Sequence, residues 1–216
     1  MDRDTRRWMG RVAWRGAAGA GLVALPFALL VRGALFASAG FGCPGWLAVG
    51  VGAAVSALAA SAVWFWVLRR LGLELSFVAL ATRAVLPTVA VFCASSLFYL
   101  SGTNAKSPEI RAAYPCLHPV LRLAVGTLRL LDPRIVLTDI DRGPSSYAAM
   151  RLPRLPASSH YRQADGTVHA IDLRTAGRGT LRNGLVRLYF EVLGFETLRH
   201  VGTADHLHVR LPELTG

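Results

Sequence analysis

The sequence predicts a three-helix transmembrane bundle followed by a small α+β domain with an antiparallel sheet. Three observations lead to this fold class: 53% of the 216 residues are hydrophobic, the longest apolar stretches lie within the first hundred residues, and all six histidines lie after them. This composition excludes disordered, collagen-like and disulfide-scaffold proteins. The first half of the chain therefore suits lipid, and the second half suits water and chemistry.

Residues 1–100 are predicted to form the membrane region, because three apolar stretches there are each long enough to cross a bilayer. They cover residues 16–39, 44–68 and 75–100, and a helix needs roughly 20 residues to cross about 30 Å of hydrocarbon. A cleaved signal peptide would explain only the first stretch. Three buried helices of a soluble protein are the alternative, which is disfavoured because soluble cores rarely need apolar runs of this length.

Basic residues predict the orientation of the bundle. The N-terminal leader contains five arginines, the turn after the second stretch contains Arg69 and Arg70, and the loop near residues 40–45 has no charge. Positive residues remain on the cytoplasmic side, so we expect a cytoplasmic N-terminus and an extracytoplasmic C-terminal domain. This topology and anionic lipid explain the net charge of +11, and no nucleic-acid-binding motif is present.

Several residues of the membrane half have two interpretations. Arg32 and Arg83 lie within the predicted spans, where charges are functional candidates, but snorkelling or helix pairing is the simpler explanation. Small residues such as Gly52 predict close packing of the helices. Cys43 and Cys116 could form a disulfide in an oxidising exterior, although two cysteines alone do not establish one.

Residues 101–109 (SGTNAKSPE) are polar and are predicted to be a linker to a domain over residues 110–216. Periodicity and turn residues predict the elements of that domain: a helix over 120–131, a short strand over 135–137, a loop over 142–159, a hairpin over 161–173 that turns at Asp165-Gly166, a helix over 181–193 that ends at Gly194, and a final strand over 206–212.

Two segments of this domain carry candidate chemistry. The first contains His160 and then Asp172, and the second is Asp205-His206-Leu207-His208. Side chains two residues apart on a strand point the same way, so His206 and His208 project together. If that strand lies beside Asp172, the imidazoles and the carboxylate converge as ligands of a catalytic zinc ion, with His160 completing the group. A polar strand edge is the alternative explanation of His-X-His.

These residues resemble the zinc site of the D-alanyl-D-alanine metallopeptidases and of the penicillin-insensitive murein endopeptidases. The resemblance covers about residues 110–212 and implies that His160, Asp172 and His208 are the zinc ligands. It also implies that His206 is the catalytic histidine, with Asp205 at the place where other members carry a glutamate base. The chain departs from the pattern in its longer step from His160 to Asp172.

Further candidates lie around this predicted zinc site. The resemblance implies that Arg142 meets the carboxylate or carbonyl of the substrate, whereas an ion pair with Asp139 or Asp141 is an equally good explanation of this arginine. Tyr147 and Ser159 are predicted to line the substrate cleft. The remaining histidines are interpreted as structural: His118, His169 and His200.

The resemblance implies a membrane-anchored zinc peptidase that hydrolyses peptidoglycan peptide bonds, as a D,D-carboxypeptidase or a murein endopeptidase. Its cofactor would be Zn²⁺, and its partners would be the stem peptides of peptidoglycan and the lipid bilayer. Its location would be the inner membrane of a bacterium, with a periplasmic C-terminal domain. Two alternatives remain open: an outer domain that binds cell-wall peptides or metal without cleavage, and a zinc amidohydrolase with another substrate.

Overall fold

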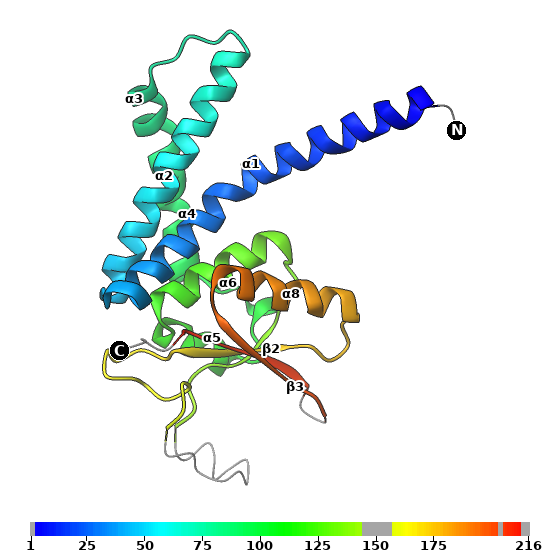
Figure 1. Cartoon of the computed structure of the whole chain (residues 1–216). Coiled ribbons are helices and arrows are strands. Elements are labelled where there is room, and N and C mark those ends of the chain that lie inside the picture. The colour runs from blue at the N-terminus through cyan, green and yellow to red at the C-terminus, as the bar shows by residue number, and fades with distance from the viewer. Residues whose placement is uncertain (1–2, 144–156, 203–204, 213–216) are drawn as a thin grey trace.

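The computed structural model describes residues 3–143, 157–202 and 205–212, which form an N-terminal helical part and a C-terminal α+β domain (Figure 1). Tyr147, predicted to line the cleft, lies outside the described residues. The helical part comprises α1 (Arg3–Phe41), α2 (Gly45–Arg70) and a third helix made of α3 (Phe77–Leu80), the π-helical turn η1 (Ala81–Val85) and α4 (Leu86–Phe98).

The prediction of three long apolar helices is confirmed. The segments Gly19–Phe41, Gly45–Arg70 and Phe77–Phe98 are long and apolar enough to cross a membrane. Only 11–28% of the most apolar part of each segment is buried within the protein. Apolar surface on this scale is costly in water, so these helices indicate membrane association.

Helices α1 and α2 pack closely where small residues meet. A Cβ atom added to Gly52 would lie 2.2 Å from the carbonyl oxygen of Leu30 and 2.9 Å from the amide nitrogen of Ala34. Only glycine permits this approach of two helix backbones, as in other membrane helix pairs. The close packing predicted for this part of the second helix is therefore present.

The C-terminal domain is attached directly to the ends of the membrane helices. Its helix α6 (Pro119–Leu131) places Arg122 and Arg129 against the end of α4, where they donate hydrogen bonds to the carbonyl oxygens of Leu97 (2.7 Å) and Tyr99 (2.9 Å). The hydroxyl of Tyr114 donates to the carbonyl of Ser96 at 2.6 Å. These bonds occupy carbonyls that a helix end leaves without intrahelical partners.

The segment predicted as a linker contains the 3-10 helix η2 (Gly102–Asn104) and leads into α5 (Pro108–Ala113) and the 3-10 helix η3 (Tyr114–Cys116). The buried Asn104 side chain donates to the carbonyl oxygens of Pro133 and Ile135, each at 2.8 Å. The segment therefore packs on the C-terminal domain and holds it close to the bundle.

The domain contains a four-stranded antiparallel sheet in the order β1-β2-β4-β3. The strands are β1 (Leu137–Asp139), β2 (Ala170–Arg174), β3 (Glu196–His200) and β4 (His206–Arg210). The pairing of β2 with β4 sets Asp172 opposite His208, and the pairing of β3 with β4 sets His200 opposite His206.

The two faces of this sheet have different surroundings. Apolar side chains of β2 and β4, such as Ile171 and Val209, are buried in one core with residues of α6 and of α8 (Thr180–Leu193). Because side chains alternate along a strand, Asp172, His206 and His208 lie on the opposite face. The helices thus separate that face from the membrane part of the protein (Figure 1).

Candidate functional site

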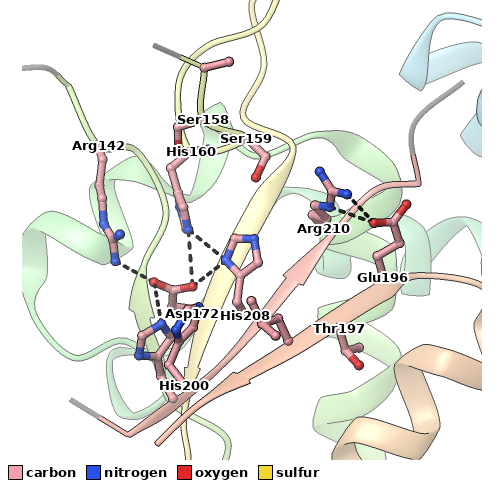
Figure 2. Close-up of a pocket in the computed structure, with 13 residues that line it drawn as sticks. Arg142, Ser158, Ser159, His160, Asp172, Glu196, Thr197, His200, His208 and Arg210 are labelled. Atoms are coloured by element: carbon pink, nitrogen blue, oxygen red, sulfur yellow. Dashed lines mark hydrogen bonds and ion pairs between the residues drawn. The ribbon is translucent and has the colours of Figure 1, made fainter. Parts of the chain in front are cut away.

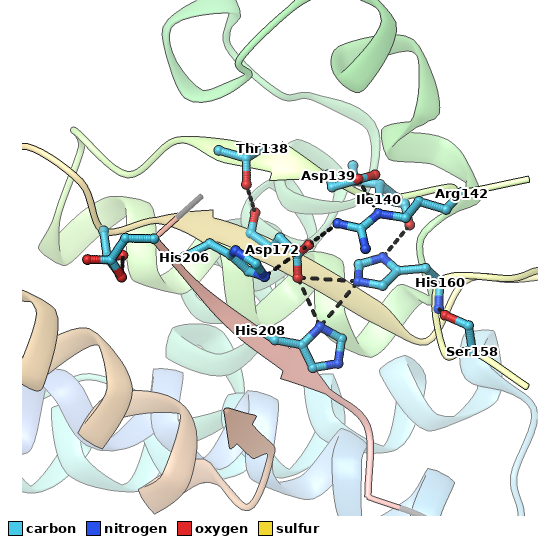
Figure 3. Close-up of polar contacts among 11 residues, drawn as sticks. Thr138, Asp139, Ile140, Arg142, Ser158, His160, Asp172, His206 and His208 are labelled. Carbon is cyan, nitrogen blue, oxygen red and sulfur yellow. Dashed lines mark hydrogen bonds and ion pairs between the residues drawn. The ribbon is translucent and has the colours of Figure 1, made fainter. Parts of the chain in front are cut away.

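Three segments bring His160, Asp172 and His208 together (Figure 3). Asp172 lies in the middle of β2, His208 is its neighbour on β4, and His160 comes from the loop before β2. The Nε2 atom of His160 lies 3.2 Å from Asp172 Oδ1 and 3.2 Å from His208 Nδ1, and His208 Nδ1 lies 2.9 Å from Asp172 Oδ1. The three predicted ligands therefore form a group that could hold a metal ion.

The loop that carries His160 is held by short-range hydrogen bonds. The hydroxyl of Ser158 accepts the backbone N–H of His160 at 3.2 Å, which is a local turn typical of serine. The carbonyl of His160 accepts the N–H of Arg142, and the carbonyl of Ser159 accepts the N–H of His169. The loop is thus fixed on both sides, and this places the imidazole above Asp172.

The hydrogen bond of the other ring nitrogen determines the tautomer of His160. Its Nδ1 lies 2.8 Å from the carbonyl oxygen of Ile140, which can only accept. In the neutral ring Nδ1 therefore carries the proton, and Nε2 turns a lone pair toward Asp172 and His208. A backbone carbonyl in this position is the usual partner of a metal-binding histidine.

Asp172 is almost completely buried, with 1% of its surface exposed. Burial opposes its ionisation, but contacts with His160 and His208 outweigh burial and hold the pKa of the carboxyl well below its usual range. The second oxygen, Oδ2, accepts from Arg142 Nη2 at 2.6 Å and lies 3.6 Å from His206 Nε2. The carboxylate is therefore ionised and surrounded by cationic or donor groups.

These residues line an open cavity of about 540 Å³ (Figure 2). Its volume is within the roughly 300–1,000 Å³ of small-ligand sites. The predicted residues Arg142, Ser159 and His206 also line it. His206 stacks on His200 with ring centroids 4.7 Å apart and an interplanar angle of 24°.

Arg142 and Asp205 have partners that limit what they can do. The Nε of Arg142 donates to Asp139, as the ion-pair interpretation expected, while Nη2 reaches Asp172. The carboxylate of Asp205 accepts from Arg199 at 2.9 Å and from Thr175 at 2.6 Å, and these bonds hold the pKa of Asp205 at about 2. Asp205 does not line the cavity.

Three further residues of the cavity with ionisable side chains were not recognised from the sequence: Glu196, His200 and Arg210. They come from β3 and the end of β4, and Glu196 accepts a hydrogen bond from Arg210 Nε at 2.8 Å. The sequence does contain a signal for His200, because Gly202 could mark a hairpin turn that pairs this residue with His206. The strand β3 itself was not predicted.

A second group that could hold a metal ion consists of His118, Asp165 and His169. His169 Nε2 lies 2.9 Å from Asp165 Oδ2, and His118 Nε2 lies 3.8 Å from the same oxygen. Here, however, His118 Nδ1 accepts the N–H of Val120 at 3.3 Å, so the proton of the neutral ring is on Nε2. A protonated Nε2 cannot serve as a metal ligand, so in this group Asp165 has a hydrogen bond to His169 and a longer contact of 3.8 Å with His118.

Cys43, Cys93 and Cys116 are all free thiols, so Cys43 and Cys116 are not paired in this structure.

No family model, curated protein or solved structure matches the chain.

Proposed function

We propose that this chain is a membrane-anchored zinc peptidase that hydrolyses peptide bonds of peptidoglycan, as a D,D-carboxypeptidase or a murein endopeptidase. One observation carries the proposal: His160, Asp172 and His208, distant in sequence, turn their donor atoms toward one another in an open cavity. Because His160 is protonated on Nδ1, its Nε2 atom faces Asp172 Oδ1 and His208 Nδ1 without a proton of its own. Only one proton, on His208 Nδ1, is then available among these three atoms. A divalent cation would satisfy all three.

The donor set supports zinc as that cation. Two imidazole nitrogens and one carboxylate oxygen are ligands of catalytic zinc sites, which keep one position open. The donor atoms are 2.9–3.2 Å apart, close to the roughly 3.3 Å between two ligands of a tetrahedral ion with bonds of about 2.0 Å. Zinc in such a site supplies Lewis-acid activation of water and of the peptide carbonyl.

Residues beside the proposed ligands would bind the substrate and move its protons. Arg142 is oriented by Asp139 at the cavity wall, where its guanidinium could bind a peptide carboxylate in exchange for Asp172. His206 is held by its stack on His200, and an imidazole there can take or give a proton at the reacting peptide bond. Asp205 is bonded elsewhere, so we assign proton transfer to His206.

The position of the cavity in the molecule suits a substrate outside the membrane. It opens on the sheet face opposite α6 and α8, and α6 is the helix that docks on the membrane part. With the N-terminus in the cytoplasm, as the arginines of the leader predict, the cavity faces away from the bilayer of a bacterial inner membrane. A peptidase in this place would reach the stem peptides of the wall above it.

Metal analysis and a muropeptide digest of the full chain in detergent test this proposal. We expect zinc in the purified protein and cleavage of peptides that end in D-Ala-D-Ala or contain D-alanyl cross-links. The variants His160→Ala and Asp172→Ala should lose one equivalent of zinc and all hydrolysis. His169→Ala, which alters only the second group, should retain hydrolysis. Normal turnover in Asp172→Ala would contradict the proposal.

The contact between Arg142 and Asp172 favours a second candidate function, in which the domain binds wall peptides without cutting them. A guanidinium at 2.6 Å from Asp172 Oδ2 already neutralises the buried carboxylate without a metal. Under this alternative the full chain would bind D-Ala-D-Ala peptides, hold no zinc at His160, and show no turnover. The same metal analysis and digest, together with peptide binding by calorimetry, separate the two functions.

A further inference from the structure

Helix α8 has two apolar faces, and the protein covers only one of them. The buried face contains Val186, Phe190 and Leu193. The other face consists of Leu181, Leu185, Leu188 and Val192, whose exposed fractions are 78%, 57%, 53% and 65%. Their spacing of four, three and four residues forms one continuous stripe along the helix.

The end of helix α6 extends this exposed apolar surface. Leu130 and Leu131 are 58% and 69% exposed, and they line a groove with the stripe of α8. The groove has a volume of about 730 Å³, and its other wall is α1 between Gly19 and Ala28. We call the exposed residues Leu130, Leu131, Leu181, Leu185, Leu188 and Val192 the α6–α8 apolar face.

The wall formed by α1 identifies the surroundings of this groove. Residues from Gly19 onward belong to a segment that is long and apolar enough to cross a membrane, and Val23 in this wall is 58% exposed. Figure 1 shows α1 passing alongside α6 and α8 and diverging from α2 toward its N-terminus. The α6–α8 apolar face is therefore continuous with the exposed apolar surface of a helix that suits a membrane.

Arg32 attaches α8 to this membrane helix. Its Nη1 donates to the carbonyl oxygen of Val192 at 3.3 Å, and a cation at a helix C-terminus is favourable for the helix dipole. Gly194, with φ of 96°, ends α8 there, and a Cβ at this position would lie 2.7 Å from Arg32 Nη1. The arginine found within a predicted span thus serves helix pairing, and it holds α8 beside α1.

We propose that the α6–α8 apolar face lies within the bilayer, so that lipid acyl chains fill the groove between this face and α1. The domain would then be partly immersed, with the apolar stripe of α8 turned toward lipid as in helices that bind membrane interfaces. Lipid is the occupant because the other wall of the groove belongs to a helix that is long and apolar enough to cross a membrane, and its exposed apolar surface is continuous with the groove. The face lies on the opposite side of the sheet from the cavity, so its role is independent of the chemistry there.

Spin labels on the full chain in lipid nanodiscs test this proposal. A label at Leu185→Cys is compared with one at Leu198→Cys, in a background with the three native cysteines replaced. The two leucines are equally exposed, at 57% and 56%, but Leu198 pairs with His208 on the cavity face. We expect the label at 185 to be several-fold more accessible to oxygen than to a water-soluble nickel chelate, and the label at 198 to show the reverse.

The other outcomes overturn the proposal. Nickel accessibility at 185 equal to that at 198 would place the face in water. Low accessibility to both reagents would place it against protein, such as a second copy of the chain. A label at Leu188→Cys repeats the measurement on the same face, and thermal unfolding of each labelled protein shows that it has folded.

Discussion

The position of one proton distinguishes the two histidine groups of the domain. In the group of His160 the backbone carbonyl of Ile140 accepts a hydrogen bond from Nδ1, which leaves the lone pair of Nε2 to bind a cation. In the group of His118 a backbone N–H occupies Nδ1, which places the proton on Nε2. In the first group His160 already turns an unprotonated nitrogen toward its partners, whereas in the second group the bond from Val120 fixes a proton on the nitrogen of His118 that a cation would need. The first group is therefore the stronger candidate.

At the scale of single residues, substitutions of His206 and of Asp205 test which side chain transfers protons. His206→Gln should retain its zinc, because the side chain is outside the ligand group, but turnover should fall by about a hundred-fold or more. Asp205→Asn should change turnover little, because its carboxylate is bonded to Thr175 and Arg199. Steady-state kinetics with a D-alanyl peptide measure both. An equal loss in the two variants would contradict the assignment to His206.

The alternation in His206-Leu207-His208 was sufficient to predict that the two imidazoles share a face, and both line the cavity. The register that sets His208 opposite Asp172 depends on pairing between distant strands, which one sequence does not specify. His200 was interpreted as structural, whereas the pairing of β3 with β4 sets it opposite His206. His200 meets His206 only because the strands β3 and β4 pair in this register.

At the scale of elements, one glycine of α2 controls the contact between two membrane helices. Gly52→Ala should destabilise the protein by about 1–3 kcal/mol, because the added Cβ would meet the Leu30 carbonyl oxygen at 2.2 Å and separate α1 from α2. Gly50→Ala is the matched control, since nothing lies within 4 Å of its added Cβ and alanine is the better helix former. Thermal unfolding in detergent compares them. Equal unfolding temperatures would show that the helices do not pack as described.

Elements with strong local signals were predicted close to their observed bounds. The helix expected over 120–131 is α6 (Pro119–Leu131), and the one expected over 181–193 is α8 (Thr180–Leu193), which ends at the predicted Gly194. The short strand expected over 135–137 lies two residues later, as β1. The sequence did not separate the exposed apolar face of α8 from its buried one, because periodicity alone does not show whether protein or lipid covers a face.

At the scale of the whole molecule, the membrane helices and the domain meet around His118. This residue caps the start of α6, and a Cβ added to Gly45 at the start of α2 would lie 2.7 Å from His118 Nε2. His118 is only 3% exposed, so the contact between the two parts encloses a titratable group. The joint between bundle and domain should therefore respond to pH.

Acidification should weaken the fold through His118. Burial is the largest cause that lowers the pKa of His118 to about 4, with a smaller contribution from His169. Between this value and the ordinary pKa of about 6.5 the unfolded chain binds a proton that the folded chain excludes, so stability falls as the pH decreases through this window. The loss is on the order of 3 kcal/mol. Unfolding of the full chain in detergent from pH 7.5 to 4.5 measures it, and His118→Gln should flatten the profile. An unchanged slope in that variant would assign the pH dependence to other groups.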